Sequence, residues 1–544
     1  MATSSFLPFS LPGFPAGPGK GFLDNKPGLQ LLLSVLSGFM LPVIIYAVLP
    51  LLGFRQLADF FSEDKIRLLF LLVGSSVYGY YLEFMVKRPS LLLYQALICS
   101  PLVVYGSRTM PGVISETLIV VAYMIIPTAV IYKNNFKSLH QKVPYLKFFT
   151  IHMAIVLLYF TFYQKDFYDY TRPGAMGLLP VGFKYLYDQL CMYFITILAG
   201  NAFICSLDKK KLLTTTSWIV SINLLFMTVI GIATCLLGMK EFYMQDHLIR
   251  RAQSLLAHPN EFAEYLSICL FFVLSLFCFR LSSPDFKLKK AEIIVQVSAI
   301  IIALIGLIMT FSKTILASAF VGLTVFGVLV IFAFRKQLAK YFVYALAVPV
   351  VMVFSLFTFQ AVTQQDVLSS LGDRLGQNES MEWRVRVNDF LTNDLTLESI
   401  WFGYGLSASN EKMSTFEVPW IDKVNHDNKI VQVVKVHNAF LKQIYDCGLP
   451  GLTIFLGLIV FAFQKLIAYV KSTSKSNICI LDIMCVSFVL FYLIACSNET
   501  IFENGGYVPP FWCLLTLLHL TSLHFQNKKI KALSIATLTK NEQI

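Results

Sequence analysis

Residues 291–334 read AEIIVQVSAIIIALIGLIMTFSKTILASAFVGLTVFGVLVIFAF, and this stretch decides the fold. It is almost wholly apolar, and its one strong interruption is Phe311-Ser312-Lys313-Thr314. A helix crosses a hydrocarbon core of about 30 Å with roughly 20 residues. The stretch is too long for one crossing, so it predicts two membrane-spanning helices joined by a tight turn at the interruption.

The rest of the chain repeats this pattern. Of its 544 residues, 56% are hydrophobic and 14% are charged, whereas a soluble domain carries about 25% charged residues. Apolar stretches of span length recur from Leu31 to Phe525 and predict about fourteen membrane spans. The expected fold is all-α, a polytopic membrane helical bundle. The predicted spans cover residues 28–50, 66–86, 90–106, 115–132, 145–163, 186–206, 217–238, 261–281, 292–311, 314–334, 340–361, 449–469, 478–497 and 508–526.

Basic residues gather in every second loop, which orients the predicted bundle. By the positive-inside rule their side is cytoplasmic, so the segments 1–27 and 527–544 are both predicted inside. The net charge of +12 is scattered over these loops rather than gathered on one soluble face, which argues against a nucleic-acid partner. The basic segments are Lys87-Arg88, Lys133–Lys147, Lys209-Lys210-Lys211, Lys287–Lys290, Arg335–Lys340, Lys465–Lys475 and Lys528–Lys531.

One long polar segment separates spans 1–11, in residues 28–361, from spans 12–14, in residues 449–526. It covers residues 362–448, and the alternation of charge predicts that it is periplasmic. Its aromatic residues, among them Trp383 and Trp401, are too many for a simple linker. A long loop of this kind is usually functional, so we expect the chemistry on this side of the membrane.

Two short clusters lie on the same side as the long loop. Arg250-Arg251 precedes His258-Pro259-Asn260, just before a span. The pattern fits either a functional cluster or an interfacial anchor followed by a helix start, with Pro259 in the first turn. At the second cluster, Ser312-Lys313-Thr314, the lysine is either an anion ligand or a side chain that snorkels to the membrane surface.

Two further clusters lie in the long loop. Residues 381–390 read MEWRVRVNDF, and the guanidinium groups of Arg384 and Arg386 suit bidentate contacts with phosphate oxygens. The alternative is a solvated loop helix that ends in the glycine turn of residues 400–405, IWFGYG. Further on, His437-Asn438 stands where the loop meets the next span. Such a histidine can act as a general base near neutral pH, or it can cap the helix or contact lipid headgroups.

In order and spacing these clusters, over about residues 245–470, resemble the O-antigen ligase and O-antigen polymerase superfamily. Members are lipid-linked glycan transferases of the bacterial inner membrane, so the resemblance implies a glycosyltransferase-C-like helical bundle. The family usually has Ser-Arg at the turn where this chain has Ser312-Lys313. Lysine keeps the positive charge of arginine but lacks its planar guanidinium group.

The resemblance also implies residue roles. His437 would be the catalytic base, and the cations would bind the donor diphosphate in place of a metal or other cofactor. No outward-facing Asp-x-Asp or His-x-x-x-His pattern stands in the sequence. The other candidate bases are His426, His247 and His258. The predicted diphosphate ligands are Arg251, Lys313 and Arg384 or Arg386, with His258 and Asn438 as supporting residues.

The implied reaction moves a glycan from undecaprenyl diphosphate to an acceptor sugar hydroxyl on lipid A-core at the periplasmic face. The alternative within the class is a repeat-unit polymerase, whose acceptor is another lipid-linked glycan. The alternative outside the class is a polysaccharide or lipid transporter. A transporter favours internal repeats and polar residues near the membrane midplane, whereas the polar chemistry here gathers in one exterior loop.

Overall fold

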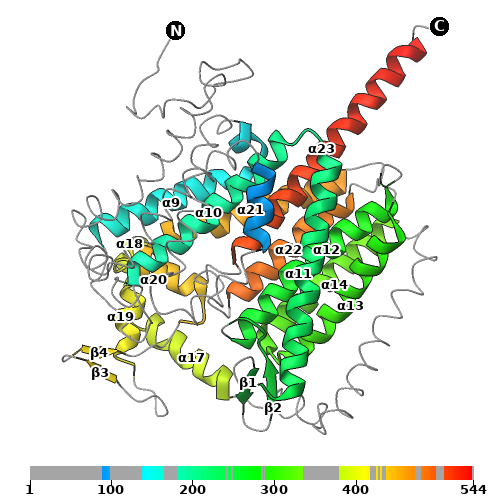
Figure 1. Cartoon of the computed structure of the whole chain (residues 1–544). Helices are drawn as coiled ribbons and strands as arrows, with labels where there is room; N and C mark the ends of the chain where they lie inside the picture. The colour runs from blue at the N-terminus through cyan, green and yellow to red at the C-terminus, as the bar shows by residue number, and fades with distance from the viewer. Residues whose placement is uncertain are drawn as a thin grey trace, which may run out of the picture.

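The structure is a computed structural model, and Figure 1 shows the whole chain. It describes residues 89–98, 138–163, 181–239, 243–246, 249–256, 258–283, 286, 288–334, 379–416, 424–426, 429–431, 436–471, 479–497 and 508–541. The predicted spans 28–50, 66–86, 115–132 and 340–361 lie outside these residues, and of the span 90–106 only the helix Pro89–Ile98 is described.

The described residues form mostly helices, and seven of these helices are long and apolar enough to cross a membrane. The expectation of a polytopic helical membrane protein is therefore confirmed, while the count of fourteen stays a prediction. The helices of the bundle are α9 (Pro144–Phe162), α10 (Val181–Cys205), α11 (Lys209–Leu237), α12 (Pro259–Ser282), α13 (Lys290–Met309), α14 (Lys313–Phe334), α21 (Thr453–Lys471), α22 (Cys479–Cys496) and α23 (Val508–Asn541).

The predicted break inside residues 291–334 is confirmed, because α13 ends at Met309 and α14 begins at Lys313. Phe311 turns the chain with a left-handed φ of 49°. Such a φ is uncommon for a residue other than glycine. The backbone N–H of Ser312 donates to the hydroxyl of Thr310 at 3.3 Å, which fixes the turn.

Several helices are longer than the predicted spans. α11 begins at Lys209, so the basic residues 209–211 lie in its first turn, where the side chain of Asp208 accepts a bond from the backbone N–H of Lys211 at 2.9 Å. α23 continues to Asn541, well past the predicted span 508–526. Hydropathy finds the apolar part of a helix, whereas caps and polar turns decide where the backbone stops.

α12 is the central helix of the bundle. Its apolar window is 83% buried, against 28% for that of α14 at the periphery. It packs against α11, α13, α14, α22 and α23. Pro259 lies in its first turn, as the sequence predicted, and Glu261 lies where an acidic side chain favours the helix dipole. The structure adds that His258 is the cap of this helix.

The predicted cytoplasmic segments that the structure describes meet on one side of the bundle. Phe286, in the link between α12 and α13, packs against Phe525 of α23 with ring centroids 5.7 Å apart. Lys210 of α11 lies 5.6 Å above the Phe286 ring. Lys465 of α21 pairs with Asp482 of α22 at 2.6 Å. The assignment of this side to the cytoplasm stays a prediction.

The opposite side carries the described part of the long loop (Figure 1), whereas the C-terminal part of α23 projects from the other side of the bundle. We call these the loop side and the tail side. The assignment of the loop side to the periplasm stays a prediction. The elements of the loop are α17 (Glu379–Thr392), α18 (Leu397–Phe402), α19 (Ala408–Ser414), β3 (Val424–His426), β4 (Lys429–Val431) and α20 (Ala439–Gly451).

The loop elements have a small hydrophobic core of their own. Its buried members come from α17, α19 and the start of α20: Val387, Leu391, Ala408, Met413, Val436 and Tyr445. Trp383 and Phe416 pack beside them with ring centroids 5.1 Å apart. This core accounts for Trp383 and Phe416, whereas Trp401 and Phe402 are exposed. It also gives the polar residues around it fixed positions.

Two short antiparallel hairpins were not expected in an all-α fold. β1 (Tyr243–Asp246) pairs with β2 (Ile249–Ala252), and β3 pairs with β4. The strands are three or four residues long, too short to show a pattern of alternating apolar residues. The first hairpin precedes α12 in the chain and is separated from it by residues 253–258.

Candidate functional site

The turn between α13 and α14 is the meeting point of three loop-side cations, Arg251, Lys313 and Arg384. We call residues 310–314 the membrane turn. It lies at the end of two candidate spans and is buried at Thr310, Phe311 and Ser312. The hydroxyl of Ser312 has no hydrogen-bond partner among the residues that the structure describes. Lys313 is half-buried and begins α14.

Arg251 is hydrogen-bonded to the membrane turn. It lies on β2 and is only 4% exposed. Its Nε donates to the carbonyl oxygen of Thr310 at 2.9 Å, and its Nη2 donates to Oδ1 of Asn260 at 2.9 Å. Arg251 thereby ties β2 to both the turn and the start of α12.

Arg250 faces the other way, because successive side chains of a strand point to opposite faces. Its Nη1 donates to the carbonyl oxygen of Cys235 at the end of α11, at 3.4 Å. Of the adjacent arginines, it is thus Arg251, the predicted diphosphate ligand, that contacts the membrane turn.

His258 reaches the same place from α12. Its Nδ1 accepts a hydrogen bond from the backbone N–H of Asn260 at 3.2 Å, which makes it the cap of that helix. Because Arg251 binds the side chain of Asn260, His258 and Arg251 converge on one residue. His258 therefore lies in the layer behind the turn.

Arg384 approaches the membrane turn from the long loop. It is half-buried on α17, and its Nη1 donates to Oγ1 of Thr314 at 2.7 Å. Arg386 is exposed on the same helix. Residues two apart on a helix differ by about 200° in direction, so the two arginines cannot face the turn together. The structure thus brings Arg251, Lys313 and Arg384 to one turn and leaves Arg386 outside it.

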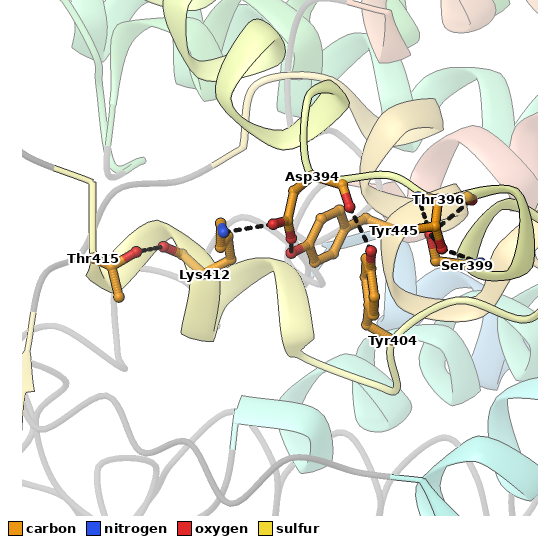
Figure 2. A network of polar contacts seen from close by, with 7 residues as sticks. All are labelled: Asp394, Thr396, Ser399, Tyr404, Lys412, Thr415 and Tyr445. Carbon is orange, nitrogen blue, oxygen red and sulfur yellow. Dashed lines mark hydrogen bonds and ion pairs between the residues drawn. The ribbon is translucent and has the colours of Figure 1, made fainter.

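A polar network fixes α17 relative to α20 (Figure 2). Asp394, just after α17, accepts from Lys412 Nζ at 2.7 Å and from the Tyr445 hydroxyl at 2.5 Å. The hydroxyl of Tyr404 donates to the backbone carbonyl of Asp394. The bonds from Lys412 and Tyr445 lower the pKa of Asp394. Burial, reinforced by the Asp394 carboxylate, raises the pKa of Tyr445.

Glycines allow α18 and α20 to touch backbone to backbone. A Cβ at Gly403 would lie 2.5 Å from the carbonyl oxygen of Asp446, and one at Gly448 would lie 2.4 Å from that of Trp401. Both glycines also have positive φ, 67° and 66°, a conformation that other residues rarely adopt. A glycine turn is therefore present at Gly403, but it ends α18, whereas the predicted loop helix ends earlier, with α17 at Thr392. The sequence did not predict the close contact with α20 at Gly448.

His437 stands at the start of α20, on the side of the loop core. Asn438, the next residue, caps α20 through Oδ1, which accepts from the backbone N–H of Leu441 at 3.0 Å. The side chain of His437 is half-buried, and Val436 before it is buried in the loop core. The three cations at the membrane turn come from β2, α14 and α17. His437 lies just before α20, and the hydrogen bond from Tyr445 to Asp394 connects α20 to the end of α17.

Comparison with known families matches one part of the chain. Residues 298–456 match the family model described as O-antigen ligase. The match runs from α13 to α21, so it includes the membrane turn, α17 and His437, while Arg251 and His258 precede it. No curated protein matches the chain.

The helices define a multi-pass membrane protein, and residues 298–456 of this protein resemble the O-antigen ligase family. The resemblance to the O-antigen ligase superfamily is thereby confirmed over these residues, and the members of this superfamily include ligases and polymerases.

Proposed function

We propose that this protein is an O-antigen ligase-like glycosyltransferase that acts at the periplasmic face of the bacterial inner membrane. It takes a glycan from undecaprenyl diphosphate and transfers it to a sugar hydroxyl of lipid A-core. The observation that carries the proposal is the gathering of Arg251, Lys313 and Arg384 at a turn where two membrane helices end.

A lipid-linked diphosphate carries its negative charge at the membrane surface, which is where these cations lie. Arg384 and Lys313 are half-buried and stand closest to that surface in our proposal. Arg251 is buried and hydrogen-bonded to the carbonyl oxygen of Thr310, so it keeps the turn in place. In our proposal its charge acts on the diphosphate from inside the protein. Fixed cations at a developing negative charge lower the barrier of the reaction without a metal ion.

The chemical step that we propose exchanges one C–O bond for another at the anomeric carbon and moves one proton to His437. The acceptor hydroxyl oxygen attacks the anomeric carbon, and His437 takes the hydroxyl proton. The bond between the anomeric carbon and the diphosphate oxygen breaks, and its electron pair leaves with undecaprenyl diphosphate. Attack opposite the leaving group inverts the anomeric configuration, which the linkage of the product reports.

The test uses the purified full-length protein in vesicles, with undecaprenyl-diphosphate-linked glycan as donor. Lipid A-core and a second lipid-linked glycan are offered as separate acceptors. Transfer to lipid A-core, with inversion, is the expected result. Transfer to the lipid-linked acceptor alone would show that the protein is a polymerase and not a ligase. Movement of the donor across the membrane without transfer to either acceptor would show that the protein is a transporter.

A deletion strain gives an independent result. Loss of a ligase leaves full-length polymer on undecaprenyl diphosphate, because polymerisation continues and its product has no exit. Loss of a polymerase leaves single repeats instead. We expect the first outcome, and accumulation of single repeats would contradict it.

A further inference from the structure

The short helix α18 exposes three large apolar side chains on the loop side. Leu397 is 75% exposed, Trp401 is 55% exposed and Phe402 is 67% exposed. Leu397 and Trp401 are four residues apart, so they lie on the same face of the helix. Ser399 is buried on the other face and completes a capping box with Thr396. A cluster of exposed apolar side chains of this size marks a surface that contacts something other than water.

The backbone of α18 is fixed on two sides, so this face cannot turn inward. On one side the hydroxyl of Tyr159 donates to the carbonyl oxygen of Phe402 at 2.5 Å. Just after α18, the backbone N–H of Leu406 donates to the carbonyl oxygen of Tyr163 at 2.9 Å. On the other side Gly403 and Gly448 bring α18 against α20. Figure 1 shows α18 beside the ends of α9 and α20.

The apolar face continues an apolar surface that already belongs to the membrane. α9 is a candidate span, and Ile151, Leu158 and Phe162 on it are exposed in the described part of the chain. Side chains of this type on a span face lipid. Phe162 and Tyr163 stand at its loop-side end, and hydrogen bonds from Tyr159 and to Tyr163 attach α18 there. Tryptophan and tyrosine are enriched where membrane meets water.

We propose that α18 lies in the surface of the bilayer at the loop-side end of α9. Leu397, Trp401 and Phe402 insert among the lipid headgroups and the upper parts of the acyl chains. The occupant of this face is therefore membrane lipid. Because α18 is joined to α20 through its backbone, this contact fixes the height of the loop core above the membrane. The inference does not depend on glycan transfer.

The experiment measures quenching of tryptophan fluorescence by lipid. The full-length protein is placed in vesicles of phosphatidylethanolamine and phosphatidylglycerol in equal parts, with or without bromine on the acyl chains. Trp401→Phe keeps an aromatic ring and removes one of five tryptophans, so the difference between wild type and variant isolates the Trp401 signal. We expect bromine near the headgroup to remove most of that signal, and bromine deep in the chain to remove less.

Two variants keep the result specific. In Trp383→Phe the lost signal comes from a residue packed against Phe416 in the loop core, and lipid bromine should leave that signal intact. Leu397→Trp in the Trp401→Phe background should restore a component that shallow bromine quenches.

Quenching of the Trp401 signal by aqueous iodide but not by lipid would overturn the proposal. Protection of that signal from both quenchers would also overturn it, because a protein partner or a second copy would then cover the face.

Discussion

Nη1 of Arg384 donates a hydrogen bond to Oγ1 of Thr314 at 2.7 Å, although the two residues lie in different parts of the chain. The bond joins the loop helix α17 to the first turn of the membrane helix α14. Arg251 holds the same turn from β2 through the carbonyl of Thr310. The loop helix and the membrane turn are thus joined by direct contacts. The proposed role of a cation at the turn can therefore be tested beside a residue that lies outside the turn.

Arg384→Lys should lower the turnover of glycan transfer about 10²-fold or more, the usual effect of removing one donor from a site of developing charge. Lysine keeps the charge but loses the planar group that donates to Thr314 and that, in our proposal, also binds phosphate oxygens. The measurement is transfer by purified variants at equal membrane levels. Arg386→Lys is the matched control, since Arg386 is exposed on the same helix, and equal losses in both variants would contradict the assignment to Arg384.

Lys313 is tested by restoring and by reversing its charge. Lys313→Arg should retain transfer, because it keeps a cation at the membrane turn. Lys313→Glu should lower turnover by about 10²-fold or more, because a carboxylate there repels the donor diphosphate. Binding of the lipid-linked donor is measured beside turnover. Wild-type transfer by Lys313→Glu would mean that the lysine only reaches toward the membrane surface.

The sequence predicts the membrane turn but not the contacts around it. The length of the apolar stretch 291–334 requires a break, and Phe311–Thr314 is the only place for it. No local pattern links Asp394 to Tyr445, because their contact depends on how α17 and α20 pack. The hairpin that carries Arg251 was missed for a different reason: its strands are short and polar.

Tyr445→Phe should weaken the attachment of α17 to α20 without removing a charge. The lost bond joins a hydroxyl to a carboxylate, and a hydrogen bond to a charged group contributes about 1.5–3 kcal/mol. Hydrogen exchange of the α17 amides should therefore quicken, while that of α12 stays unchanged. Equal exchange of α17 in variant and wild type would show that the network does not hold the loop.

Asp394→Asn probes the same network through pH. The pKa of Asp394 is lowered in the folded protein, so its stabilising effect is complete above the ordinary pKa of an aspartate and is lost as the pH falls through the folded value. The difference in melting temperature between wild type and Asp394→Asn should be constant near neutral pH and shrink in acid. A difference that grows in acid would have the wrong sign for this network.

The topology is tested by reporter fusions. The charge alternation predicts that residues 362–448 face the periplasm and that both termini face the cytoplasm. Fusions after Gln377 and at the C-terminus should therefore report opposite compartments. Reports from the same compartment would mean that the number of spans between them is even rather than odd.

His437 is the residue whose loss should separate catalysis from binding. A sugar hydroxyl is a weak nucleophile at neutral pH, and a positioned base contributes about 10²- to 10⁴-fold to the rate. His437→Ala should lower turnover by that factor and leave donor binding intact, because the cations at the membrane turn are unchanged. Asn438 caps α20 without help from the imidazole, so the helix start survives the substitution. His426→Ala, in the hairpin of β3 and β4, is the control and should transfer at the wild-type rate. Near wild-type turnover by His437→Ala would remove the histidine as the base, whereas loss of donor binding would make it a ligand of the diphosphate instead.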